Sequence, residues 1–242
     1  MTGPAVPPAF RLAYVPGVTP DKWVRIWRER YPATPLTLDQ VAAADAADVV
    51  RGRGADAVLL RLPVDKTGLH AIPLYTEQTV IVVPKDHLLA EAAEVFPADV
   101  ADEVLLHPAD DVLDWTDLPG QRARHEPATT AAAVELVAAG VGLLVVPQSL
   151  ARLHHRRDLT YLPFPDAPES RVALSWLEDE TTDAVDQLIG VVRGRTVNST
   201  RGRGPAQVAE RPKPAASQAA GGARRRTAAP RTGRNRKPRR RS

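Results

Sequence analysis

The chain has 242 residues, of which 43% are hydrophobic and 25% charged, and none is a cysteine. That size suits one ordinary domain or two small lobes, and the lack of cysteine excludes a disulfide framework, a thiolate zinc site and a cysteine nucleophile. No apolar run approaches the roughly 20 residues that cross a bilayer, and no charged leader precedes an apolar stretch at the N-terminus. We therefore expect a cytoplasmic protein with no membrane partner.

The net charge of +3 hides two segments of opposite sign. Residues 193–242 contain 16 of the 32 Lys and Arg residues and a single acid, Glu210, so they carry +15. Residues 1–192 contain the other 16 basic residues and 28 acidic ones, so they carry −12. The basic segment has almost no large apolar side chain and cannot bury enough surface to offset the entropy of ordering. We predict that 1–8 and 193–242 are disordered and that 9–192 fold.

The first half of the folded span predicts strands that alternate with helices. Proline at the first helical position and glycine behind a helix mark two of the boundaries. We expect strands at 9–15, 36–39, 57–60 and 71–83, with Pro84 as the break, and helices at 20–31 and 43–51.

The second half continues the alternation after a loop at 108–127 that contains four aspartates. We expect a helical turn at 97–101, strands at 104–107, 143–146, 159–164 and 172–176, and helices at 129–139, just after Pro147, and from Thr181 or Thr182 to about 192. Such alternation predicts the α/β class with a largely parallel sheet.

The segment 129–150 carries the clearest local signals. A hydroxyl of Thr129 or Thr130 can cap a helix by accepting from the free amides of its first turn, and such amides also suit an anion. Gly140 ends this helix, and Gly142 permits a tight turn and a close approach to neighbours. The short apolar run that follows is typical of a strand buried on both faces.

This segment resembles the signature of the effector-binding (substrate-binding) domain of LysR-type transcriptional regulators. It reads Leu-Val-Ala-Ala-Gly-Val-Gly at 136–142, with Pro147 and Ser149 behind the strand. Other motifs follow in the family's order: Phe-Arg-Leu-Ala-Tyr at 10–14, Trp-Arg-Glu-Arg-Tyr-Pro at 27–32, Gly-Ala-Asp-Ala-Val-Leu at 54–59, Pro-Leu at 73–74 and the passage 80–90, where Leu88 replaces the usual proline. The resemblance covers residues 9–192.

The resemblance implies an α/β, two-lobed fold like that of type 2 periplasmic binding proteins. Lobe one would comprise 9–83 and 160–192, and lobe two 84–159. The family's N-terminal helix-turn-helix has no counterpart ahead of Phe10, so we expect a stand-alone effector-binding domain. The stretch between Pro84 and Thr129 is about one helix shorter than in the family, which predicts a trimmed second lobe.

The family's effectors usually sit between the lobes, and the resemblance brings two turns of this chain there. One turn contains Gly17, Val18 and Thr19, and the other Thr129 and Thr130. In open α/β sheets, ligands bind at the carboxyl ends of strands near helix N-termini of this kind, although ordinary helix caps are an alternative interpretation.

Arg61 ends a predicted buried strand, where a guanidinium can hold a carboxylate in a bidentate fork. A surface arginine is an equally weighted alternative. Each helix N-terminus offers about half a unit of positive charge. Convergence of Thr19, Arg61, Thr129 and Thr130 on one gap would therefore favour a small anionic metabolite.

No motif predicts an enzyme, a metal or a cofactor. Adjacent His154 and His155 diverge by about 100° on a helix, so they cannot share one metal. The aspartates between 110 and 117 lack the glycine and the terminal glutamate of a calcium loop, and neither Ser149 nor Ser175 stands in a nucleophile elbow. We expect no catalytic residues and no cofactor.

Trp23 and Trp27 lie one helical turn apart. They form either a homodimer surface, as the side-by-side pairing of LysR effector domains implies, or part of the domain's own core.

The C-terminal segment predicts contact with DNA or RNA. Arg201 and Arg203 stand in Arg-Gly-Arg-Gly-Pro, close to the core of an AT-hook, which places arginines in narrow minor grooves. Basic clusters without aromatics suit phosphates more than bases. These clusters are Arg224, Arg225 and Arg226, and Arg236, Lys237, Arg239, Arg240 and Arg241. A solvated tail, or a tail paired with the acidic body, is the alternative.

Three functions therefore stand beside one another. The first is a sensor in transcriptional regulation that binds a small anionic effector. The second is a ligand-free protein-interaction module. The third is a solute-binding protein of the same fold, which is disfavoured because such a protein needs export and no secretory signal is visible.

Overall fold

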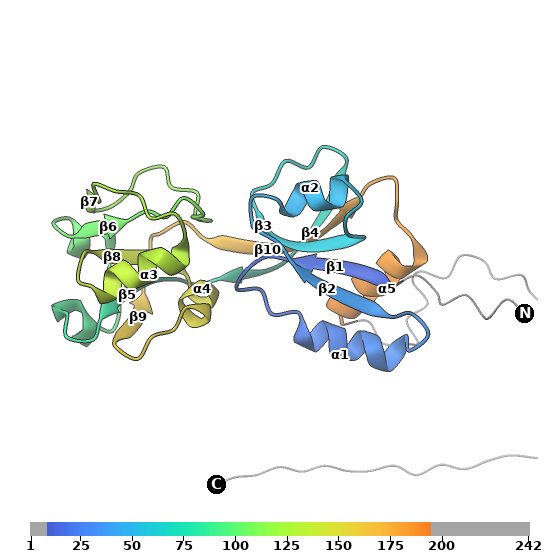
Figure 1. Cartoon of the computed structure of the whole chain (residues 1–242), viewed down its shortest axis with the longest axis horizontal. Coiled ribbons are helices and arrows are strands. Elements are labelled where there is room, and N and C mark those ends of the chain that lie inside the picture. Colours follow the sequence, from blue (N-terminus) through green and yellow to red (C-terminus); the bar gives the residue numbers. More distant parts are fainter. Residues whose placement is uncertain (1–8, 195–242) are drawn as a thin grey trace, which may run out of the picture. The chain divides into compact units, whose positions relative to one another are not determined.

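The computed structural model describes residues 9–194, so the expectations for 1–8 and 195–242 lie outside it. The described residues form two five-stranded sheets with helices packed on them (Figure 1), in agreement with the predicted α/β class. No helix in this part of the chain is long and apolar enough to span a membrane.

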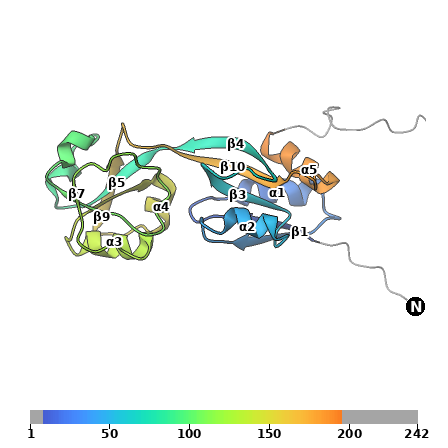
Figure 2. The same ribbon diagram turned by 90° about the horizontal axis from the view of Figure 1, so that it is seen from above.

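The first sheet has the strand order β2-β1-β3-β10-β4. Its strands are β1 (Phe10–Tyr14), β2 (Leu36–Gln40), β3 (Ala57–Leu62), β4 (Leu69–Glu77) and β10 (Ser170–Leu177). Strand β1 runs parallel to β2 and β3, and β10 runs antiparallel to β3 and β4. Helices α1 (Asp21–Arg30) and α5 (Asp183–Val192) cover one face and α2 (Ala46–Arg51) the other (Figures 1 and 2). Because both faces are covered, β3 and β10 are apolar at consecutive positions.

The second sheet has the strand order β7-β6-β8-β5-β9. Its elements are β5 (Thr79–Pro84), β6 (Val104–Leu106), β7 (Gln121–Arg122), β8 (Leu143–Pro147), β9 (Leu159–Pro163), α3 (Thr130–Ala138), α4 (Gln148–Leu153) and the 3₁₀ turns η1 (Leu88–Glu91) and η2 (Pro97–Val100). Alternate side chains of β5 enter different cores: Val80 and Val82 pack with the residues of α3 and α4, and Ile81 and Val83 with Val95 and Val100 on the other face.

The helix–turn–strand predicted for 129–146 is confirmed. Thr129 is the N-cap of α3, and its hydroxyl accepts from the Ala132 N–H at 3.1 Å. Gly140 has a φ of +71° just behind the helix, and a Cβ on Gly142 would lie 2.6 Å from the carbonyl oxygen of Val104. Glycine is thus required at 140 by conformation and at 142 by a close approach to β6.

The structure moves both predicted crossings between the lobes. The single strand expected at 71–83 is divided at Gln78, and β5 pairs with β8 and β9 in the second sheet. The chain therefore crosses at Gln78 rather than near 84, and it returns after Pro163 rather than at 160. The sheets are also mixed rather than largely parallel, because the strands beside the crossings, β5 and β10, run antiparallel to their neighbours. From here lobe one denotes the first sheet with its helices, and lobe two denotes the second.

Trp27 belongs to the core of lobe one. Its side chain is fully buried, stacks on Phe10 with ring centroids 5.1 Å apart, and donates from Nε1 to the Thr34 carbonyl at 2.9 Å. Trp23 is half-buried and packs against the same core. Trp27 is therefore not available to a dimer surface, and the homodimer stays a prediction that needs other residues of α1.

Candidate ligand-binding site

A cavity of about 450 Å³ lies where the two lobes meet. Lobe one contributes Pro16, Gln40, Ala42, Ala43 and Arg61 to its lining, and lobe two contributes Asp110, Val112, Thr129, Thr130, Ala131, Leu150, Leu153 and His154. An adjoining cavity of about 480 Å³ shares Arg61 and Asp110 and extends to Asp111 and Asp114. Volumes of this size are usual for sites that hold small molecules.

Three of the predicted binding residues, Arg61, Thr129 and Thr130, line this cavity together. Gly17 lies beside it: its φ is +84°, and a Cβ there would lie 2.6 Å from the Ser149 Oγ, so glycine allows the first turn of lobe one to approach α4. Val18 is buried in the core of lobe one instead.

Thr19, which the sequence predicts as a binding residue, does not line the cavity. Thr19 is exposed and lines neither cavity, and α1 begins at Asp21 with Pro20 at the N-cap position and no side-chain cap. Because Pro20 stands at the N-cap position, the Thr19 hydroxyl accepts no hydrogen bond from an amide of α1. Among the helices of residues 9–194, α3 lines the cavity with its first two residues, Thr130 and Ala131, and α4 lines it with Leu150 and Leu153.

Arg61 is held entirely by the protein around it. The guanidinium pairs with Glu77, with 3.1 Å from Nη2 to Oε2, and the two side chains are 5% and 7% exposed. Its other bonds run from Nη1 to the Pro16 carbonyl at 2.8 Å, from Nε to the Ser170 Oγ at 3.1 Å and from Nη2 to the Ser149 Oγ at 3.1 Å. Glu77 therefore balances the charge of Arg61 and already accepts from the guanidinium that the sequence predicts as the contact for a ligand carboxylate.

The N-terminus of α3 also has an acceptor from the protein, the carboxylate of Asp110. The Oδ1 atom of Asp110 accepts from the Thr130 N–H at 2.6 Å and from the Thr130 hydroxyl at 2.8 Å. Together with the Thr129 hydroxyl on Ala132, two amides of the first turn have side-chain acceptors. Sequence reasoning missed Asp110, which lies 20 residues ahead of Thr130 in a loop without periodicity.

The loop before α3 is folded around a second aspartate, Asp111. Its carboxylate lies 2.9 Å from Nδ1 of His107 and accepts from the Leu113 N–H at 2.9 Å and from Trp115 Nε1 at 3.2 Å. Burial raises the pKa of Asp111 above its ordinary value, although these donors and His107 oppose the shift. The loop that presents Asp110 is thus a folded part of lobe two. Among residues 9–194, no group of three or more His, Asp or Glu side chains is placed to hold a metal ion.

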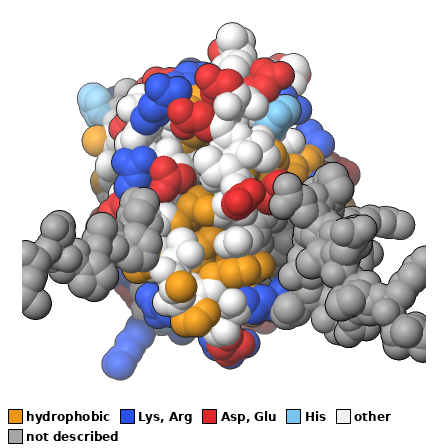
Figure 3. All heavy atoms as spheres, turned by 90° about the vertical axis from the view of Figure 1, so that its right-hand side faces the viewer, with side chains coloured by type: hydrophobic (Ala, Val, Ile, Leu, Met, Phe, Trp, Pro, Cys, Tyr) orange, Lys and Arg blue, Asp and Glu red, His pale blue; other side chains and the backbone are white. Residues whose placement is uncertain are grey.

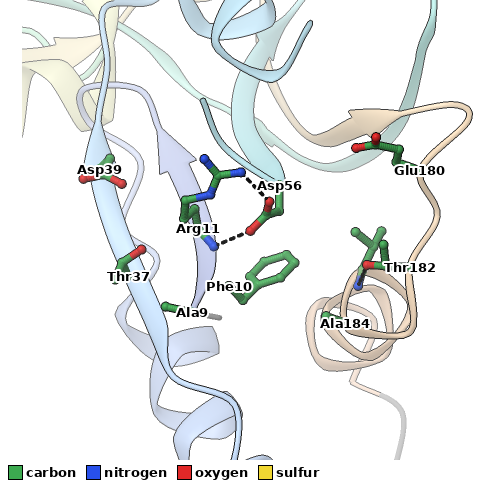
Figure 4. Close-up of a pocket in the computed structure, with 10 residues that line it drawn as sticks. Ala9, Phe10, Arg11, Thr37, Asp39, Asp56, Glu180, Thr182 and Ala184 are labelled. Carbon is green, nitrogen blue, oxygen red and sulfur yellow. Dashed lines mark hydrogen bonds and ion pairs between the residues drawn. The ribbon is translucent and has the colours of Figure 1, made fainter. Parts of the chain in front are cut away.

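Another hollow, of about 680 Å³, lies at the end of lobe one where β1 begins. Figure 3 shows hydrophobic side chains gathered at this end of the molecule, and Figure 4 shows Phe10 beside the pair of Arg11 and Asp56. Arg11 Nη2 donates to Asp56 Oδ1 at 2.7 Å, and this hydrogen bond raises the pKa of Arg11, so these two side chains satisfy each other. The carboxyl end of β1 leads instead to Pro16 in the interlobe cavity, which is the end where open α/β sheets bind ligands.

Comparison with known proteins agrees with this architecture. Residues 9–196 match the family model of the LysR substrate binding domain. A probable hydrogen peroxide-inducible genes activator of Mycobacterium avium is 30% identical over 205 residues, which are 78% of this chain and 66% of that protein. The chain thus spans just under two thirds of that relative.

Two solved structures share the fold. The oxidised form of OxyR superposes with a TM-score of 0.66 at 21% identity, over 78% of this chain and 95% of that one. The BenM effector-binding domain with its effector benzoate gives a TM-score of 0.66 at 21% identity, over 79% and 96%. With the family match over most of its length, the chain belongs to the LysR substrate-binding domain family, whose members in this comparison are parts of transcriptional regulators.

Proposed function

We propose that residues 9–194 are the effector-binding domain of a LysR-type regulator and that a small molecule binds in the interlobe cavity. The observation that carries the proposal is the 450 Å³ cavity itself, which takes its lining from both lobes. A ligand that contacts both lobes favours one arrangement of the lobes over others, and this difference in affinity is what a sensor needs. In this role the domain would act in the cytoplasm and catalyse no reaction.

The relatives suggest two kinds of stimulus. The M. avium protein is named for induction by hydrogen peroxide, and the BenM domain was solved with benzoate. Reversible oxidation of a protein usually needs a cysteine or a methionine. These 242 residues contain no cysteine, and their one methionine is Met1. This composition supports a bound small molecule over an oxidised side chain.

The anionic ligand that the sequence predicts has one remaining support, the positive end of α3. Two carboxylates of the chain, Asp110 and Glu77, already accept from the donors that such a ligand would use. An anion would have to displace one of them.

A screen for thermal stabilisation tests the proposed function. Full-length protein is melted with a library of small metabolites of every charge, beside an Ala42→Trp variant. Ala42 is exposed and lines both cavities, so an indole at that position should occupy the space without removing a core contact. We expect at least one compound to raise the Tm of the unaltered chain and not that of the variant. Equal stabilisation of both proteins would contradict a site in the cavity.

We also propose, as the sequence predicts, that the basic segment beyond residue 194 contacts nucleic acid phosphates. Support comes from charge alone, since the predicted Arg and Lys contacts lie outside the described residues. Fluorescence anisotropy with a random-sequence DNA duplex tests it. Replacing Arg236, Lys237 and Arg239–Arg241 with Gln should weaken binding and flatten the log–log salt dependence by about 0.9 for each lost phosphate contact. An unchanged slope would refute the proposal.

A further inference from the structure

We infer that the interlobe cavity of this protein takes a cationic ligand, a small molecule with a protonated amine beside an apolar portion. This inference rests on the proposed function, because it names the ligand class of the same cavity. It reverses the charge that the amino-acid sequence alone suggests, and the reversal follows from how the donors of the cavity are already used.

The first donor group is the guanidinium of Arg61. It forms its ion pair with Glu77 at 3.1 Å, and the three further hydrogen bonds go to Pro16, Ser149 and Ser170. Both charged side chains are more than nine-tenths buried, so the pair behaves as a neutral unit at the wall of the cavity. A ligand carboxylate could bind the guanidinium in a bidentate fashion only if it displaced Glu77.

The second donor group is the N-terminus of α3. The carboxylate of Asp110 lies over it, 2.6 Å from the Thr130 amide and 2.8 Å from the Thr130 hydroxyl. A ligand anion at this helix end would meet a fixed negative charge within a few ångströms, and like charges at that distance repel. The place that commonly receives an anion is filled by the chain.

What remains at the cavity surface is a negative charge beside apolar side chains. Asp110 lines both adjoining cavities and Asp114 one of them, and within the described lining the only Lys or Arg is the neutralised Arg61. Apolar lining comes from Ala42, Ala43, Val112, Leu150 and Leu153. A protonated amine would pair with Asp110, and its carbon skeleton would cover the apolar side chains, among them the half-exposed Leu153.

Matched probes of one carbon skeleton test the sign of the charge. Binding of benzylamine, benzyl alcohol and benzoate to the full chain is measured by calorimetry and by Tm shift, at equal ionic strength and pH 7. We expect benzylamine to bind at least about tenfold more tightly than benzoate, because the sign of one full charge near Asp110 changes.

Two variants assign the effect to Asp110. Asp110→Asn keeps an acceptor for Thr130 and removes the charge, so benzylamine should lose about tenfold in affinity and benzoate should gain. The matched control is Asp117→Asn, which removes the same charge from an exposed position of the same loop outside both cavities. It should leave the affinities of all three probes unchanged.

The comparison of the three probes on the unaltered chain needs no variant to fold. Tighter binding of benzoate than of benzylamine, lost in Ala42→Trp, would overturn the cationic ligand and leave the proposed function in place. Binding of no probe would refute the inference and leave the proposed function to its own library screen. Binding that Ala42→Trp does not reduce would overturn the cavity as the ligand site and the proposed function with it. An equal loss of benzylamine affinity in Asp117→Asn would show a general charge effect and also refute the inference.

Discussion

Breaking the Arg61–Glu77 pair should lower the free energy of unfolding more than removing any surface charge of this domain. Glu77→Gln keeps the shape of the side chain but leaves the guanidinium of Arg61, which is 5% exposed, without a counter-charge. Removing one partner of a buried ion pair typically costs about 3–5 kcal/mol. For a domain of this size, 1 kcal/mol lowers the Tm by about 2–4 °C, so we expect a drop of about 6–20 °C.

A double-mutant cycle separates the pair from its surroundings. Urea unfolding is measured for the unaltered chain, Glu77→Gln, Arg61→Met and the double variant Arg61→Met/Glu77→Gln, with Glu94→Gln as an exposed control. The double variant should recover much of either single loss, because it leaves no buried unpaired charge. A free energy of unfolding of Glu77→Gln within about 0.5 kcal/mol of that of the control, which is the usual range of surface substitutions, would refute the predicted cost.

Three further predictions concern the core, a helix cap and pH. Trp27→Ala removes a fully buried side chain and should lower the free energy of unfolding by about 3–5 kcal/mol in urea; a loss below 1 kcal/mol would contradict its place in the core. Thr182→Ala removes the hydroxyl that accepts from the Val185 N–H at the start of α5, so it should cost about 1 kcal/mol, whereas Thr182→Ser should cost little. Burial raises the pKa of Asp111 above its ordinary value of 3.8, so its charge destabilises the fold above the folded-state pKa, and this penalty disappears as the pH falls below 3.8. The stability of the unaltered chain relative to Asp111→Asn should therefore decrease as the pH rises through that range in urea titrations, and a constant difference would contradict the shift.

Local signals predicted the elements that depend on neighbouring residues. The cap at Thr129, the stop at Gly140 and the buried strand behind Gly142 can be predicted from residue types within a few positions of each other, and the structure contains all three. The division at Gln78 could not be predicted in this way. The residues on both sides suit an extended strand, and only the pairing of β4 with β10 and of β5 with β8 and β9 separates them.

In the candidate site, three of the lining residues could be predicted from the sequence, but their hydrogen-bond and ion-pair partners could not. Arg61, Thr129 and Thr130 could be selected from the sequence because strand ends and helix starts collect at one edge of a sheet. Their partners could not, since Glu77 lies 16 residues from Arg61 and Asp110 lies 20 residues from Thr130. In each case the two partners lie on different elements of the chain, so no repeat within one helix or strand relates them, and the electrostatic balance of the cavity depends on tertiary contacts.

The contacts of Arg61 connect the cavity to both crossings between the lobes. Arg61 stands on β3, and its partners are Glu77 at the end of β4, Ser170 at the start of β10 and Ser149 in lobe two. Three of these four residues belong to lobe one, so among the side-chain contacts of Arg61 only the hydrogen bond to Ser149 joins the two lobes. Its donor is the charged guanidinium, and a hydrogen bond that involves a charged group contributes about 1.5–3 kcal/mol. A ligand that moves lobe two, as the proposed function requires, would have to offset this bond, whereas the buried pair of Arg61 and Glu77 lies within lobe one and would stay intact.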